Sequence, residues 1–116
     1  IGSHDDFLEI LEKKNPDGSV FFAENDTIAL GVIKALKEKK YKVPGNVSII
    51  GFDDIAYSSV SSPTLTTVHV QRKGLGKQTV IQLLQLIDEN KILPIKTRVT
   101  GRLVVRDSVK ILEKNA

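Results

Sequence analysis

Residues 19–54 read SVFFAENDTIALGVIKALKEKKYKVPGNVSIIGFDD, and this stretch decides the fold class. Ser19–Ala23 is a short apolar run long enough for a buried strand, and Val47–Phe52 is a second one. Between them, a period near 3.6 predicts a helix, capped by Asn25 or Asp26, with an apolar stripe of Ile28, Ala29, Val32, Ile33 and Leu36. A strand, a helix and a strand within about thirty residues predict a parallel pair with a right-handed crossover, and therefore an α/β fold.

The flanking sequence continues the alternation of helices and strands. Asp5–Lys14 predicts a helix, and the turn residues Asn15-Pro16-Asp17-Gly18 separate it from the first strand. Beyond the second strand, a polar, serine-rich loop leads to the β-branched segment Leu65–Val70, which predicts another strand. Arg98–Arg106 is again β-type, with a bend or bulge expected at Gly101.

A long helix is predicted over residues 73–89, and its apolar side chains extend around much of its circumference. The main stripe contains Val80, Leu83, Leu84 and Ile87. Other apolar residues fall outside that stripe, namely Leu75, Ile81 and Leu86. A helix with this distribution is normally covered on more than one side, so we expect it to pack against a neighbour.

The composition is typical of one soluble globular domain: 116 residues, 41% hydrophobic and 27% charged. No apolar run approaches the roughly 20 residues of a membrane span, and the start of the chain lacks the features of a secretory signal. The absence of Met indicates a fragment or a processed product, and residues 1–4 resemble part of a cloning remnant. The absence of Cys excludes disulfides, thiolate metal sites and cysteine nucleophiles.

The charge balance is mildly basic, at +3 from 17 Lys and Arg against 14 Asp and Glu, which does not by itself indicate a nucleic-acid-binding protein. The densest basic stretch is Lys37–Lys42, at the predicted end of a helix, where cations complement the helix dipole. The alternative interpretation of these lysines is a phosphate-binding patch.

Polar side chains follow both strands of the predicted parallel pair. Asn25 comes shortly after the first strand, and Asp53 directly after the second. In an open parallel sheet, ligands bind outside the carboxyl ends of the strands, so the two residues are candidates for one site. An amide offers donors and an acceptor, and a carboxylate accepts from two hydroxyls, which suits a neutral polyol, a sugar or a nucleoside. The alternative is that Asn25 only caps its helix and Asp53 only orders its loop.

Evidence for catalysis is weak. The acidic pair Asp53 and Asp54 could hold Mg²⁺ for phosphoryl transfer, but the chain has no Gly-rich phosphate loop. His4 and His69 look too isolated for a metal site or a catalytic triad, and Ser48 lacks the glycines of a nucleophile elbow. We therefore expect no enzyme activity, no metal and no cofactor.

Several blocks of the chain occur in a recognisable order and spacing: residues 22–31 (FAENDTIALG), 43–54 (VPGNVSIIGFDD), 63–68 (PTLTTV), 75–76 (LG) and 103–108 (LVVRDS). Together they resemble the lactose-repressor (LacI/GalR) family of bacterial transcription regulators. Each block alone is weak evidence, but the ordered set is specific and spans nearly the whole chain from about Phe7. The resemblance implies a parallel-sheet, Rossmann-like lobe of the type I periplasmic-binding-protein-like fold, incomplete in this chain.

The resemblance also implies a cytoplasmic regulator that binds a small effector, a sugar or related metabolite, in a cleft between two lobes. Asn25 and Asp53 match family positions that commonly contact the effector. Arg72 falls where sugar-responsive members carry an aromatic that stacks on the ligand, so it is a third ligand-binding candidate and favours an anionic group such as a phosphate. Because affinity needs groups from both walls of a cleft, we expect weak effector binding by this chain alone.

The family's DNA-binding helix-turn-helix, hinge helix and most of the other lobe have no counterpart in this sequence. The resemblance implies that residues 5–116 are the C-terminal part of an effector-binding and dimerisation domain, and that operator DNA is bound only through the missing N-terminal domain. Residues 73–89 are then expected to pack on the missing lobe or on a partner chain, as a homodimer or with the helix exchanged between copies. The alternative with the same fold is an extracytoplasmic sugar-binding protein of an ABC transporter.

Overall fold

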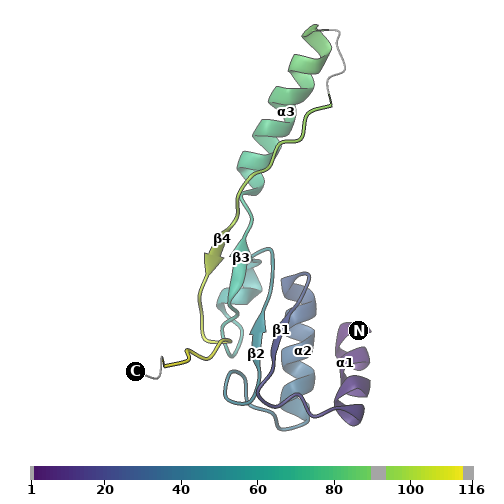
Figure 1. Cartoon of the computed structure of the whole chain (residues 1–116), viewed down its shortest axis with the longest axis vertical. Helices are drawn as coiled ribbons and strands as arrows, with labels where there is room; N and C mark the ends of the chain where they lie inside the picture. Colours follow the sequence, from purple (N-terminus) through teal and green to yellow (C-terminus); the bar gives the residue numbers. More distant parts are fainter. Residues whose placement is uncertain (1, 90–93, 114–116) are drawn as a thin grey trace.

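A strand–helix–strand crossover organises the chain in the computed structural model, which describes residues 2–89 and 94–113. Strand β1 (Val20–Phe22), helix α2 (Asp26–Glu38) and strand β2 (Ser48–Ile50) follow one another, and the two strands pair in parallel (Figure 1). The α/β fold and the parallel pair predicted from the sequence are therefore confirmed.

Strand pairing continues beyond β2 toward the C-terminal half of the chain. Isolated parallel bridges join the end of β2 and the loop after it to the next segment, at Ile50–Thr66 and Asp53–His69. That segment contains strand β3 (Thr67–His69), which pairs antiparallel with strand β4 (Arg102–Val104). The β-type sequence around β4 forms a strand only after Gly101, whose missing side chain lets the backbone approach β3: a Cβ there would lie 2.8 Å from Val68 Cγ1.

Two helices build the core on one side of the sheet. α2 packs on β2, and helix α1 (Gly2–Lys13) packs on α2. The ring of Phe7 meets the ring of Phe21 edge to face, with 5.2 Å between centroids, so α1 also reaches β1. The basic stretch Lys37–Lys42 lies at the carboxyl end of α2, as predicted. The buried apolar core consists of Phe7, Ala23, Ala29, Val32, Ile33, Ala35, Leu36, Val47, Ile49 and Leu65.

The opposite face of β1 is open. Side chains alternate along a strand, so Phe21 faces the helices while Val20 and Phe22 point the other way. Val20 is 64% and Phe22 is 65% exposed. The prediction of a buried strand is therefore wrong for this half of β1, because no helix among the described residues covers that face.

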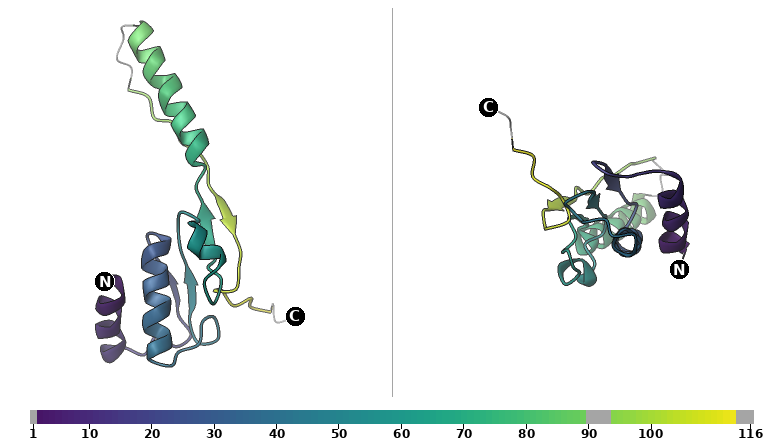
Figure 2. Two further views of the ribbon diagram at one scale, coloured as in Figure 1. Left: turned by 180° about the vertical axis from the view of Figure 1, so that it is seen from behind. Right: turned by 90° about the horizontal axis from the view of Figure 1, so that it is seen from below.

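Helix α3 (Arg72–Glu89) projects away from the lobe and lengthens the molecule to 59 × 40 × 25 Å (Figures 1 and 2). Residues 94–101 return along its side, and Gln82 Nε2 donates to Thr97 Oγ1 between the two segments. The helix predicted over residues 73–89 is confirmed. Its apolar side chains are exposed, including Leu75, Val80, Ile81, Leu83, Leu84, Leu86 and Ile87. None of the described helices is both long enough and apolar enough to cross a membrane.

Candidate ligand-binding site

The carboxyl edge of the parallel sheet brings Asn25 and Asp53 together. The backbone N–H of Asp26 donates to the carbonyl of Phe52 at 2.8 Å. This bond joins the peptide unit that follows Asn25 to the peptide unit that precedes Asp53. The predicted proximity of the two candidate residues is therefore confirmed, whereas ligand binding by them stays a prediction.

Asn25 is the N-cap of α2. It has extended backbone, with φ −152° and ψ 168°, and its Oδ1 accepts from the N–H of Ile28 at 2.9 Å. Its Nδ2 makes no hydrogen bond to the described part of the chain, and the side chain is half-buried. Capping therefore uses the carbonyl of Asn25 and leaves its amide donor for another partner.

Asp53 occupies a strained turn at the same edge. Its φ of 112° lies in the left-handed region that favours glycine, which costs on the order of 1 kcal/mol for other residues. Its backbone N–H donates to the carbonyl of Val68 at 3.0 Å, which fixes the turn against β3. The carboxylate remains 40% exposed. Asp53 thus orders its loop through the backbone and keeps its side chain accessible.

Arg72 begins α3 and contacts Asp53. Its Nη2 donates to the main-chain carbonyl of Asp53 at 2.9 Å and lies 3.9 Å from the carboxylate oxygen Oδ1. The side chain is 59% exposed. The three candidates from the sequence, Asn25, Asp53 and Arg72, therefore lie at one end of the sheet.

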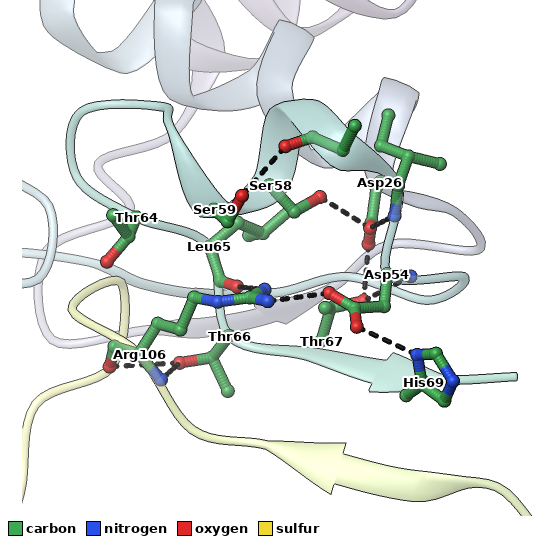
Figure 3. A network of polar contacts seen from close by, with 12 residues as sticks. Asp26, Asp54, Ser58, Ser59, Thr64, Leu65, Thr66, Thr67, His69 and Arg106 are labelled. Atoms are coloured by element: carbon green, nitrogen blue, oxygen red, sulfur yellow. Dashed lines mark hydrogen bonds and ion pairs between the residues drawn. The ribbon is translucent and has the colours of Figure 1, made fainter.

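Asp54, next to Asp53, belongs to a polar network that holds β3 and the segment after β4 together (Figure 3). Its Oδ1 accepts from Arg106 Nη2 at 2.7 Å, and its Oδ2 lies 2.9 Å from His69 Nδ1. Arg106 Nη1 also donates to the carbonyl of Leu65 at 2.8 Å. The bridge between Asp53 and His69 aligns His69 beside this loop, and its pairing with Asp54 is a contact that the sequence did not indicate.

The pKa of Asp54 reflects this network. Burial raises the pKa of the carboxyl, but hydrogen bonds and charge attraction from Arg106 and His69 outweigh that effect and hold the pKa below its ordinary value. The carboxylate is therefore ionised at neutral pH and stabilises the fold through its partners.

Acid should remove this contribution. A carboxyl whose pKa is lower in the folded chain contributes its full stability above the unfolded pKa, and this is lost as the pH falls from about 4 through the folded pKa. We expect Arg106→Gln to lose about 1–2 kcal/mol of unfolding free energy at neutral pH and to show a shallower decline toward about pH 3 in urea titrations. Asp6→Asn, at an exposed carboxyl on α1, is the control. Parallel pH profiles for the wild type and Arg106→Gln would contradict the assignment.

Asp26 is a structural residue that sequence reasoning considered only as a cap. Its side chain is fully buried and accepts three hydrogen bonds, from the N–H of Ile55 at 2.9 Å, from Ser58 Oγ at 2.6 Å and from Thr67 Oγ1 (Figure 3). Ser58 belongs to the 3₁₀ helix η1 (Ala56–Ser59). Asp26 therefore ties α2, η1 and β3 together beneath the candidate site. The available sequence signal was the serine-rich loop, whose buried hydroxyls need an acceptor.

Among residues 2–89 and 94–113, no group of His, Asp and Glu side chains is arranged to hold a metal ion. Both oxygens of Asp54 already have partners in Arg106 and His69. Of the two carboxylates considered as magnesium ligands, only that of Asp53 therefore remains accessible.

Comparison with known proteins identifies the family. The periplasmic binding protein-like domain family matches residues 3–109. The chain belongs to this family. The periplasmic binding protein-like match agrees with the fold implied by the sequence resemblance, a type I periplasmic-binding-protein-like lobe.

Relatives of this periplasmic binding protein-like chain include transcription regulators. It is 42% identical to the HTH-type transcriptional repressor PurR of Haemophilus influenzae over 104 residues, 87% of this chain and 30% of the relative. A putative LacI-family regulator from Sanguibacter keddieii superposes with a TM-score of 0.82 at 35% identity, over 91% of this chain and 39% of that chain. A LacI-family regulator from Arthrobacter sp., solved with lactose, gives 0.79 at 28% identity, over 93% and 40%.

These matches confirm the resemblance to LacI/GalR regulators and favour it over the transporter alternative. The relatives in question are regulators and not enzymes. The chain spans about a third of their length, between 30% of the curated repressor and 40% of the lactose-bound regulator.

Proposed function

We propose that this chain is the C-terminal part of the effector-binding and dimerisation domain of a bacterial transcription regulator. It supplies one wall of a cleft for a small, sugar-like effector. The supporting observation is the gathering of Asn25, Asp53 and Arg72 at one edge of the sheet, each with an accessible polar group. The lactose bound to the Arthrobacter relative supports the ligand class.

The chemistry of this edge suits hydroxyl groups. Asp53 offers carboxylate oxygens that accept from adjacent hydroxyls, and such charge-assisted hydrogen bonds are about twice as strong as neutral ones. Asn25 Nδ2 donates to a hydroxyl or ring oxygen, and Arg72 adds further donors. The other half of the cleft comes from a lobe outside this chain.

Replacing Asn25 separates capping from ligand binding. Ser is as good an N-cap as Asn but has no amide donor, so Asn25→Ser keeps the helix cap and removes the group proposed to bind. In the full-length protein, we expect Asn25→Ser and Asp53→Asn each to weaken effector binding by about tenfold or more, because one side of a buried hydrogen bond is lost. Asn15→Ser is the matched control, since Asn15 Oδ1 also accepts from a backbone N–H, at Asp17.

The measurement is isothermal titration calorimetry with the sugar that most raises the melting temperature of the wild type in a screen of mono- and disaccharides. Undiminished affinity in Asn25→Ser, together with lower stability in Asn25→Ala, would show that Asn25 is a cap and nothing more.

In this proposal, α3 packs on a lobe or partner chain outside the described residues. An exposed apolar surface of this size favours association, so the isolated chain should form a dimer or larger species. Val80 and Leu84, each 55% exposed and one helical turn apart, are suited to a test. We expect Val80→Glu with Leu84→Glu to shift the chain toward monomer in sedimentation velocity runs, while Lys77→Glu with Gln78→Glu does not. A monomeric wild type at crystallisation concentrations would contradict this part.

The regulator acts in the cytoplasm and binds operator DNA through an N-terminal domain outside this chain. The gene supplies the discriminating observation. A helix-turn-helix encoded upstream supports the regulator, whereas a signal peptide there would establish the transporter component instead.

A further inference from the structure

We propose that the effector carries a phosphate group, bound in a cationic hollow between β3 and α3, with His69 as a specificity-determining residue. This inference rests on the proposed function and adds the chemical class of the ligand. The ligands expected at this site are phosphorylated sugars and related phosphate monoesters rather than neutral sugars.

The hollow lies where β3 ends and α3 begins. It has a volume of about 330 Å³ and is lined by His69, Val70, Gln71, Arg72 and Lys73. Three of these side chains are cationic or can become so. The bond from Arg72 Nη2 to the Asp53 carbonyl, at 2.9 Å, places the hollow beside the edge that carries Asp53 and Asn25. A ligand with hydroxyls at that edge therefore has a cationic surface next to it.

Asp54 fixes the orientation of the His69 ring. Its Nδ1 lies 2.9 Å from Asp54 Oδ2, and Asp54 is fixed in turn by Arg106 at 2.7 Å. The carboxylate requires a proton on Nδ1, which leaves Nε2 for an outside partner. Nε2 makes no hydrogen bond to the described residues, and the side chain is 39% exposed.

The charges around the hollow leave it net positive. Asp54 is paired with Arg106, and the exposed carboxylate of Asp53 faces Arg72. Lys73 forms no ion pair within the described part of the chain. Arg102 stands directly opposite His69 in the β3–β4 register, and opposite residues share a face of the sheet. A dianionic group therefore meets more cations than carboxylates.

Calorimetric titration of the full-length protein with matched pairs tests the inference. The pairs are ribose with ribose 5-phosphate and glucose with glucose 6-phosphate. We expect the preferred sugar to bind about tenfold or more tightly as its phosphate, with an advantage that shrinks as salt is raised. His69→Gln and Lys73→Gln should each reduce the ratio of the two affinities severalfold. Lys42→Gln is the matched control, because Lys42 lines a different hollow at the other end of the sheet.

The outcomes separate the two proposals. Equal affinity for a sugar and its phosphate would overturn the phosphate inference and leave the proposed function standing. Binding of neither member of any pair, together with no stabilising sugar in the screen, would overturn both. An unchanged ratio in His69→Gln, with the fold retained by circular dichroism, would remove His69 from the site.

Discussion

Replacing Asp26 with alanine is expected to destabilise the lobe by about 3–5 kcal/mol. The substitution removes a fully buried acceptor and leaves three donors without a partner: the N–H of Ile55 and the hydroxyls of Ser58 and Thr67. Ser58 and Thr67 are themselves completely buried, so water cannot readily replace the carboxylate. The loss should appear as a lower midpoint in urea unfolding followed by far-ultraviolet circular dichroism.

Asp26→Asn refines this test. The amide keeps the shape of the carboxylate, and a serine or threonine hydroxyl can rotate to accept from its NH₂ group. We therefore expect Asp26→Asn to lose about half as much stability as Asp26→Ala. Asp6→Ala, at an exposed position of α1, should change stability by less than about 0.5 kcal/mol. A loss for Asp26→Ala no larger than that of Asp6→Ala would mean that the buried network does not stabilise the lobe.

A methyl group at Gly51 is expected to destabilise the lobe by about 3 kcal/mol. Gly51 lies between β2 and the segment that leads into β3, and its N–H donates to the carbonyl of Thr66 at 2.9 Å. An added Cβ would overlap Asp26 Oδ1 and lie 3.0 Å from Leu65 Cδ2. Both neighbours are completely buried and hydrogen-bonded or packed, so neither can move cheaply.

Gly76→Ala is the matched control for Gly51→Ala. Gly76 lies within α3, and a Cβ there would meet nothing within 4 Å. Because alanine favours helix over glycine by about 1 kcal/mol, Gly76→Ala should increase the helicity of α3. A loss of stability in Gly51→Ala without a loss in Gly76→Ala would show that close packing around Asp26 causes the effect at Gly51. Similar stabilities for both variants would contradict the close contacts at Gly51.

The elements that could be predicted from the sequence are those with local signals. The period of apolar residues within α2 and α3, and the turn residues before β1, depend only on neighbours along the chain. Asn25 and Asp53 could be found as candidates because they stand at strand ends. Their proximity follows from the parallel pairing of β1 and β2.

The polar networks could not be predicted in the same way. Thr67 is 41 residues from Asp26, and Arg106 is 52 residues from Asp54. Which distant side chain meets which carboxylate depends on the path of the chain between them. The open face of β1 could not be predicted for a similar reason, because an apolar strand sequence does not show whether another element packs on its second face.

At the carboxyl edge of the parallel sheet, two pairs of adjacent residues each combine an exposed position with a structural one. In Asn25–Asp26 and in Asp53–Asp54, the first residue presents an accessible polar group, and the second is bound into the interior. A substitution of the first residue that preserves its backbone role, such as Asn25→Ser, can therefore alter ligand preference while the architecture beneath it survives. The second residues do not have this freedom, so redesign of recognition at this edge is open at one position of each pair and closed at the next.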